Sequence, residues 1–205
     1  MAHIELSNTF PGIGGLMAYR PETGQVLSQL AETLLRGPST LSPMERELIA
    51  THVSQLNECH FCMSSHAAAA MHLAGEDRAV VESVRRDPQT APISTKLKTL
   101  LVIAGKVQKS GREVTDGDIS AARAAGATDI EIHDTVLIAA AFSMYNRYVD
   151  GLGTWAPEKQ EEYEEMGAAL AGQGYMRRRA EAPPANAPAT EAPAAEAPAA
   201  EAQIG

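Results

Sequence analysis

Residues 47–66 read ELIATHVSQLNECHFCMSSH, and they hold both cysteines of the 205-residue chain. Cys59 and Cys62 form a Cys-x-x-Cys pair, and His66 follows the second cysteine by four residues. Glu47 precedes the first cysteine by twelve. A thiol needs a neighbouring base to form a thiolate readily at neutral pH, so this combination of side chains indicates thiol redox chemistry. We therefore expect the other helices to bury and orient this segment.

A helix predicted over Cys59–Ala74 would bring the reactive side chains together. Successive residues of an α-helix turn by about 100°, so Cys59, Cys62 and His66 should share one face within about 60°. Two sulfurs on one face can form a disulfide, and His66 can accept the proton of Cys62 or stabilise its thiolate. Glu47, on the preceding helix, is placed to orient His66 or to relay the proton.

Two effects compete over which sulfur attacks. The dipole at a helix N-terminus favours a thiolate at Cys59, by about 0.3–1 kcal/mol if that residue is exposed. His66, one turn away, favours Cys62 instead, and a direct ion pair in a partly buried site should outweigh the dipole. We expect Cys62 to attack and Cys59 to be the resolving thiol.

The chain as a whole has the composition and periodicity of a helical protein. Hydrophobic residues make up 44% of it but aromatic residues only 4%, so Ala, Leu, Val, Ile and Met must fill the core. Capping boxes at Ser42–Glu45 and Thr128–Glu131 mark helix starts. We find no segment with the alternation of a strand. The prediction is an all-α, single-domain helical bundle, with helices over residues 21–35, 43–56, 59–74, 77–86, 95–110, 116–125, 128–149 and 157–170.

Three regions differ in composition. Residues 1–20 contain one proline and three closely spaced glycines, so we expect an irregular N-terminal surface arm. Residues 21–179 carry the helical periodicity and form the predicted domain. Residues 180–205 repeat Ala, Pro and Glu with almost no large apolar side chain, so we expect a disordered tail.

Charge and apolar patterning exclude several classes of protein. The net charge is −9, and four glutamates of the tail leave −5 for the rest, so nucleic acid is not an expected partner. We see neither a signal peptide nor an apolar run of about 18 residues, so we expect a cytoplasmic protein without membrane contact. In that reducing compartment, a close cysteine pair indicates redox or metal chemistry rather than a structural disulfide.

The cysteine cluster is also compatible with a zinc site or with a purely structural role. Cys59, Cys62 and His66 could be three zinc ligands with a water as the fourth, although three ligands from one helix strain a tetrahedral site. The cysteines could instead be buried helix residues with incidental neighbours. We expect no metal and no cofactor. The other polar residues of interest are expected to be structural, and they are His52, His60, His72, His133, Asn146 and Arg147.

The arrangement Glu47, Cys59-x-x-Cys62, x-x-x-His66 resembles the signature of the alkyl hydroperoxidase D-like branch of the carboxymuconolactone decarboxylase superfamily. The resemblance covers roughly residues 15–155. The family also has a histidine directly before its second cysteine, and the residue there in this chain is phenylalanine. The further matching segments are Pro21–Arg36, Glu45–Ile49 and Tyr145–Arg147.

This resemblance implies an all-helical fold of the alkyl hydroperoxidase D-like type, assembly into trimers or hexamers, and a peroxidase cycle. In such a cycle one cysteine reduces a hydroperoxide and becomes a sulfenic acid, and the second condenses with it to a disulfide. By position, Glu47 and His66 resemble the proton relay, Cys62 the peroxidatic thiol and Cys59 the resolving thiol. The implied reductant is a dithiol, such as a lipoylated or thioredoxin-like protein.

The expected function is therefore a thiol-dependent peroxidase that reduces organic hydroperoxides or hydrogen peroxide. A non-catalytic redox sensor or interaction protein would use the same dithiol, but each subunit would be oxidised once without turnover. A lactone decarboxylase, the activity after which the superfamily is named, does not rely on a Cys-x-x-Cys pair, so the cysteines argue against it.

Overall fold

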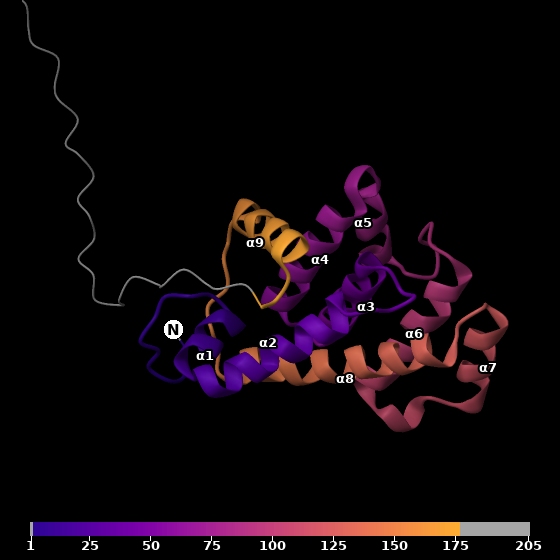
Figure 1. Ribbon diagram of the computed structural model, residues 1–205, viewed down its shortest axis with the longest axis horizontal. Coiled ribbons are helices and arrows are strands. Elements are labelled where there is room, and N and C mark those ends of the chain that lie inside the picture. Colours follow the sequence, from indigo (N-terminus) through magenta and orange to yellow (C-terminus); the bar gives the residue numbers. More distant parts are fainter. Residues whose placement is uncertain (1, 177–205) are drawn as a thin grey trace, which may run out of the picture.

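The computed structural model of the chain describes residues 2–176, and every regular element in this range is a helix. The predicted all-α class is therefore confirmed. Two short 3₁₀ turns, η1 (Gly75–Asp77) and η2 (Gly111–Glu113), accompany the α-helices. Figure 1 shows the α-helices of the described part: α1 (Ile13–Tyr19), α2 (Pro21–Arg36), α3 (Pro43–Leu56), α4 (His60–Ala74), α5 (Ala79–Arg86), α6 (Thr95–Lys109), α7 (Asp116–Ala124), α8 (Asp129–Gly151) and α9 (Gln160–Gln173).

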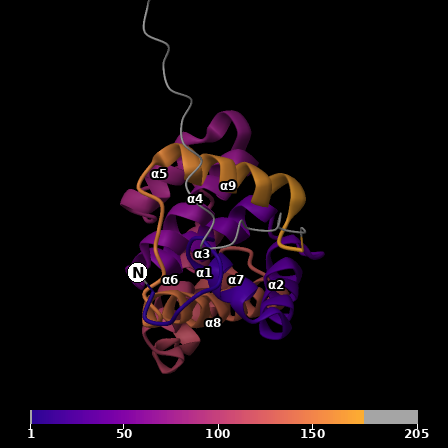
Figure 2. The ribbon, with the colours of Figure 1, turned by 90° about the vertical axis from the view of Figure 1, so that its left-hand side faces the viewer.

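The hairpin of α3 and α4 lies in the middle of the molecule. Helix α9 packs along the outer side of α4, and the long α8 packs on α3 from the other side, as the two ribbon views show (Figures 1 and 2). Helices α2 and α6 also contact both α3 and α8. The junction between α3 and α4, where the cysteines lie, is thus enclosed by helices from both ends of the chain.

Small side chains let the central helices approach closely. Residues 67–70 of α4 are four alanines, each at most 2% exposed. Opposite them, α9 carries Gly167, where an added Cβ would lie 2.5 Å from the backbone carbonyl carbon of Ala68. Interiors packed at this density leave no room for an extra methyl group without a shift of the backbone. The contact between α4 and α9 therefore depends on glycine at this position.

The predicted capping boxes at Ser42 and Thr128 are confirmed, and Ser94 caps α6 in the same way. The side chain of each residue accepts a hydrogen bond from the backbone amide three residues later, at distances of 3.2, 3.1 and 3.3 Å. These bonds satisfy backbone amides that have no partner within the helix. This is the physical reason why a serine or threonine at these positions predicts the start of a helix.

The prediction of an irregular N-terminal arm is wrong for Ile13–Tyr19, which form α1. Gly14 and Gly15 are buried within this helix, and Leu16 has no exposed surface. Glycines disfavour an isolated helix, but packing against the rest of the fold can supply the stability of so short an element. Here the glycines permit close packing instead of breaking the helix.

Other element boundaries also differ from the predictions. From the helical spacing of apolar residues over 43–56 we expect Leu56 to face the core, but it is 44% exposed at the end of α3. The last helix begins at Gln160 rather than at Pro157, which is buried in the preceding segment. The predicted disordered tail, 180–205, and residues 177–179 of the predicted domain lie outside the described residues.

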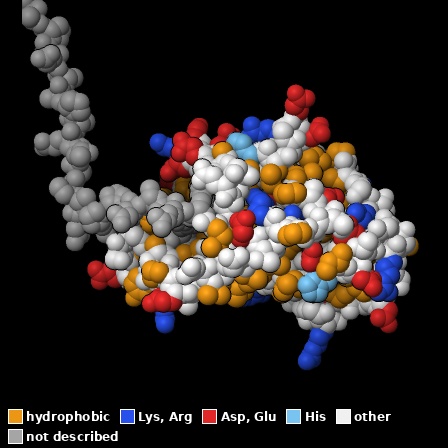
Figure 3. All heavy atoms as spheres, in the orientation of Figure 1, with side chains coloured by type: hydrophobic (Ala, Val, Ile, Leu, Met, Phe, Trp, Pro, Cys, Tyr) orange, Lys and Arg blue, Asp and Glu red, His pale blue; other side chains and the backbone are white. Residues whose placement is uncertain are grey.

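Acidic and basic side chains are interspersed on the face of the molecule shown in Figure 3, and its described residues form no broad basic patch there. Apolar side chains lie among them. None of the helices within residues 2–176 is long and apolar enough to span a membrane.

Candidate active site

A tight turn after α3 sets the position of the first cysteine. Glu58 has a φ of +59°, a left-handed conformation that residues with a Cβ seldom adopt. Its amide donates to the carbonyl of Gln55, and the Cys59 amide donates to the carbonyl of Ser54, both at 3.0 Å. This pair of bonds is a Schellman motif, in which the chain leaves a helix abruptly. The break between the helices predicted over residues 43–56 and 59–74 is confirmed.

Cys59 does not lie on the face of α4, and the prediction that it does is wrong. The helix begins at His60, and Cys59 is its N-cap residue with extended backbone angles of −80° and 95°. An N-cap side chain faces the third residue of the helix, as in a capping box, and here that residue is Cys62. The two thiols therefore meet at the helix start, although not for the reason that the periodicity suggested.

Both thiols are free and buried, with 0% of Cys59 and 3% of Cys62 exposed. The hydrogen bond with the Cys62 side chain and burial both raise the pKa of the Cys59 thiol above its ordinary value. The carboxylate of Asp150, at the end of α8, raises it further. Cys59 is thus held as a protonated thiol in this reduced state.

Glu47 and His66 are joined directly, across the interface of α3 and α4. The Nδ1 atom of His66 lies 2.7 Å from Oε2 of Glu47, whose side chain has no exposed surface. Burial by itself raises the pKa of Glu47, but the charge of His66 and its hydrogen bond, together with Arg36, lower it below the ordinary value. The carboxylate is therefore ionised, and it orients the imidazole ring.

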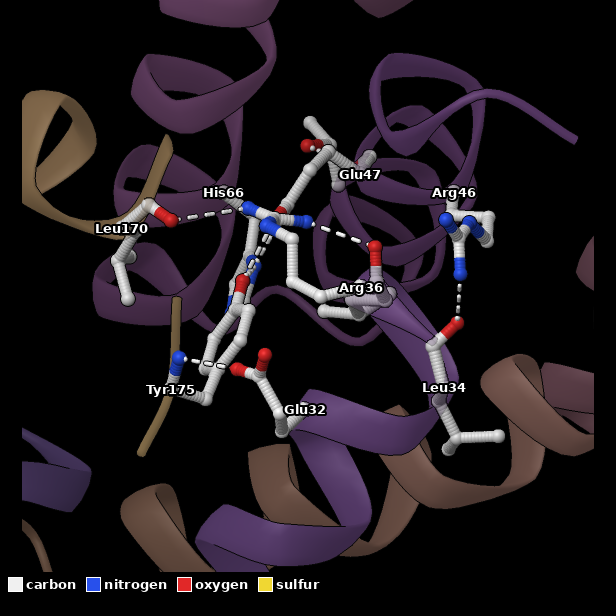
Figure 4. A network of polar contacts seen from close by, with 10 residues as sticks. Glu32, Leu34, Arg36, Arg46, Glu47, His66, Leu170 and Tyr175 are labelled. Atoms are coloured by element: carbon white, nitrogen blue, oxygen red, sulfur yellow. Dashed lines mark hydrogen bonds and ion pairs between the residues drawn. The ribbon is translucent and has the colours of Figure 1, made fainter. Parts of the chain in front are cut away.

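Arg36 and Tyr175 complete the network around Glu47, and neither was predicted from the sequence. Nη2 of Arg36 donates to Oε1 of Glu47 at 2.5 Å, and the Tyr175 hydroxyl donates to the same oxygen at 2.6 Å. The hydroxyl is also 3.2 Å from Nδ1 of His66. Figure 4 shows the four side chains converging from α2, α3, α4 and the segment after α9.

No periodicity or motif in the sequence points to these two residues. Arg36 is the last residue of α2, where a basic side chain ordinarily serves to complement the helix dipole. Tyr175 follows α9 and stands 109 positions beyond His66. Only the fold brings them to the carboxylate.

A small cavity connects the histidine with the second cysteine. Its volume is about 50 Å³, enough for one or two water molecules. Cys62 and His66 both line it, whereas Cys59 does not. Within residues 2–176 no direct hydrogen bond joins Cys62 to His66, so a molecule in the cavity would contact both. The other lining residues are mostly apolar: Ile13, Met17, Ala31, Phe61, Phe142, Tyr145 and Tyr175.

Known proteins similar to this chain fall in one family. The model of the carboxymuconolactone decarboxylase family matches residues 21–90, which include the whole cysteine segment. A solved structure of an uncharacterized peroxidase-related protein from Silicibacter sp. TM1040 is 27% identical. It aligns over 75% of this chain and 78% of its own, with a TM-score of 0.68. The alkylhydroperoxidase AhpD core protein from Ralstonia eutropha JMP134, an uncharacterized peroxidase-related protein, is also 27% identical. It aligns over 77% and 81%, again with a TM-score of 0.68.

The family match and the two solved structures together support a place for this chain in the alkyl hydroperoxidase D-like branch of the carboxymuconolactone decarboxylase superfamily. The expected resemblance is thereby confirmed. A search of curated proteins finds no significant match.

The chain departs from the pattern of the family that it resembles beside the second cysteine. Phe61 occupies the position of the family histidine, and this residue is 8% exposed and lines the cavity. His60, one position earlier, is exposed and packs edge-on against Tyr163, with ring centroids 5.8 Å apart. Neither residue places an imidazole at the thiols, so His66 is the histidine of this site.

The remaining polar residues singled out from the sequence make structural contacts in this alkyl hydroperoxidase D-like fold. Asn146 is fully buried and donates to Ser54 at 3.0 Å, which ties α8 to α3 as expected. His72 contacts the carbonyl of Glu164 in α9. His52 is packed beside α6, where burial lowers its pKa. Two others lie at the surface, and they are His133 and Arg147.

The zinc alternative finds no ligand set in the described part of the chain. Within residues 2–176, no group of three or more His, Cys, Asp or Glu side chains is arranged to hold a metal ion. Cys59 and Cys62 face each other, while His66 is engaged through Nδ1 by Glu47. The site consists of two thiols beside an imidazole–carboxylate pair.

Proposed function

We propose that this protein is a thiol-dependent peroxidase that reduces organic hydroperoxides or hydrogen peroxide. One observation carries the proposal. Cys62 and the Glu47-bound His66 line the same small apolar cavity, and a second thiol, Cys59, contacts Cys62 from outside it. A nucleophile, a base and a resolving thiol are the groups that such a cycle needs.

In the first half of the cycle a hydroperoxide, ROOH, enters the cavity beside Cys62. His66 accepts the thiol proton through Nε2, because its Nδ1 is held by Glu47. The Cys62 thiolate attacks the terminal peroxide oxygen, the O–O bond breaks, and the leaving RO⁻ takes the proton from His66 to give ROH. Cys62 has then become a sulfenic acid, and the peroxide has been reduced by two electrons.

In the second half Cys59 attacks the sulfenic sulfur of Cys62. A disulfide forms, and the sulfenic oxygen leaves as water with the Cys59 proton. Cys59 is well placed for this step because an N-cap residue faces the third residue of its helix. A dithiol reductant, such as a lipoylated or thioredoxin-like protein, then restores both thiols. The family resemblance also supports a homo-oligomer, a trimer or a hexamer.

Peroxide consumption by variants of the two cysteines tests the proposal. With dithiothreitol as reductant, Cys62→Ser should abolish turnover, because no peroxidatic thiol remains. Treated with peroxide in the absence of any reductant, Cys59→Ser should react once and stop at a sulfenic acid, which dimedone traps at Cys62 and mass spectrometry detects. Wild-type protein treated with peroxide should lose two mass units as the disulfide forms. If the double serine variant consumed peroxide at the wild-type rate, the proposal would be wrong.

The burial of both thiols also fits a redox sensor, because a bulky protein reductant would not reach an intact site of this kind. The same assay separates the two functions. A sensor would be oxidised once per subunit and would not turn over with any dithiol, whereas a peroxidase would consume many equivalents of peroxide.

A further inference from the structure

We propose that Tyr175 is a positioning residue of the thiol site. It acts through Glu47 and His66, because its hydroxyl keeps the Glu47 carboxylate ionised and oriented toward the imidazole. This inference rests on the proposed role of Cys62 as the reacting thiol. It makes the segment after α9 a part of the active-site machinery, although Tyr175 does not contact either sulfur.

The backbone around Tyr175 is anchored independently of its hydroxyl. The Tyr175 amide donates to Oε2 of Glu32 in α2 at 2.6 Å. The preceding residue, Gly174, has a φ of +69°, and an added Cβ there would lie 2.5 Å from the same carboxylate oxygen. Glycine at this point allows the chain to turn directly over Glu32. The ring of Tyr175 is therefore delivered to Glu47 by a fixed backbone.

The Tyr175 ring is packed as firmly as its backbone. It stacks on His66 with an interplanar angle of 12° and ring centroids 6.0 Å apart. The guanidinium of Arg36 lies over the ring, 5.2 Å from its centroid. The hydroxyl consequently reaches both Oε1 of Glu47 and Nδ1 of His66. A hydroxyl held in this way can fix the direction of the imidazole–carboxylate bond.

The charges around Glu47 explain why a neutral donor matters. Glu47 is fully buried, and an unpaired buried carboxylate would take up a proton. The hydrogen bond from Tyr175 helps to lower the pKa of Glu47. Burial and the Glu47 charge raise the pKa of Tyr175, so its hydroxyl stays a donor at neutral pH. The titratable groups that face Glu47 or Tyr175 are Glu32 and Arg36 from α2, Arg46 from α3 and His66 from α4.

The test is Tyr175→Phe, which removes the hydroxyl and keeps the ring. The rate of Cys62 alkylation by iodoacetamide is measured across the pH range in a Cys59→Ser background, with mass spectrometry identifying the modified residue. Loss of the donor raises the proton affinity of the coupled Glu47–His66 pair, so the acid limb of the profile should move to higher pH by roughly one unit. The midpoint of the profile distinguishes a positioning role from a purely structural one, because a variant with a loosened site would change the alkylation rate by the same factor at every pH.

Tyr19→Phe is the matched control, because Tyr19 is half-exposed on α1 and has no part in the site. Its profile should coincide with that of the parent protein. Gly174→Ala gives a second test if Tyr175→Phe fails to fold. An added Cβ there would lie 2.5 Å from the Glu32 carboxylate, so it displaces the anchor of Tyr175 without any change of charge, and it should shift the midpoint less and in the same direction. Unchanged midpoints in the folded variants would overturn the inference.

Alkylation reads the reactivity of Cys62 without any peroxide, so the two proposals can fail separately. A shifted midpoint in a protein that never turns over peroxide would support the role of Tyr175 and contradict the peroxidase. Normal peroxide turnover by the wild type with an unshifted midpoint in Tyr175→Phe would support the peroxidase and contradict the role of Tyr175.

Discussion

Glu47 shows at the scale of a single residue how this site is built. Its carboxylate has no contact with solvent, and Arg36, His66 and Tyr175 all bind it. Moving such a charge out of water costs several kcal/mol of free energy. The attraction of its partners roughly offsets this cost, so a buried ion pair of this kind adds little net stability. The main effect of the network is that Glu47 stays ionised and orients the His66 ring.

A second buried carboxylate, Glu131, predicts how stability depends on pH. Burial raises its pKa, but the Lys96 ammonium at 2.7 Å and the Thr128 amide at 2.8 Å lower it to about 2, from 4.5. A depressed pKa means that the stabilisation is complete above pH 4.5 and is lost as the pH falls toward 2. Between these limits the free energy of unfolding should fall by about 2 kcal/mol more in the wild type than in Glu131→Gln.

Urea unfolding at a series of acidic pH values measures this difference. Glu22→Gln is the control, because Glu22 is an exposed glutamate of α2 whose removal should leave the acid dependence as it is. A Glu131→Gln protein with the same acid dependence as the wild type would show that Glu131 contributes no such stabilisation.

At the scale of elements, the site depends on how α3, α4 and α9 meet. The Schellman turn at Glu58 sets Cys59 at the head of α4, and the alanines of α4 admit α9 at close range. Helix α9 carries Tyr163 against the cysteines and leads to Tyr175. The contact between α4 and α9 therefore governs both the cover of the thiols and the position of the hydroxyl.

Gly167→Ala should separate these two helices. The new methyl group would lie 2.5 Å from the Ala68 backbone, so α9 must move, at a cost of about 1–3 kcal/mol in unfolding free energy. Gly172→Ala, in the same helix, meets no atom within 4 Å and should be neutral or stabilising by up to about 1 kcal/mol. Thermal denaturation of the two variants checks this, and equal melting temperatures would contradict the close contact.

At the scale of the whole molecule, both thiols lie inside the fold. Neither cysteine is more than 3% exposed, and the cavity beside Cys62 is about 50 Å³. Small oxidants such as hydrogen peroxide fit such a space, whereas a protein dithiol or a long-chain peroxide requires part of the enclosure to open. The segments that enclose the thiols come from α1, α8 and α9.

A bulky thiol reagent should therefore fail to label the native protein. Fluorescein maleimide is expected to react with Cys59 and Cys62 more than about tenfold faster in denaturant than in buffer, because labelling requires local opening. Mass spectrometry of the labelled peptides measures both rates. Rapid native labelling of Cys59 would show that this thiol is accessible and would contradict its burial.

Much of this fold followed from local signals. The capping boxes at Ser42 and Thr128 and the break after α3 were predicted because backbone amides at helix ends need partners within a few residues. Helix α1 was missed, since its glycines are stabilised by packing rather than by propensity. The thiol pair was predicted correctly from a wrong geometry, because the spacing that suits one helix face also suits an N-cap and the third helical residue.

The order of residues along the chain was enough to indicate an all-helical protein with a dithiol at the start of α4, because helix periodicity, capping and the Cys-x-x-Cys spacing are properties of neighbours. The contacts of the Glu47 carboxylate could not be predicted from the sequence in this way. Arg36 and Tyr175 reach Glu47 from 11 and 128 positions away, and the latter arrives only because α9 packs on α4 and the chain turns at Gly174. Contacts across such distances depend on how helices pack, and no local pattern records them.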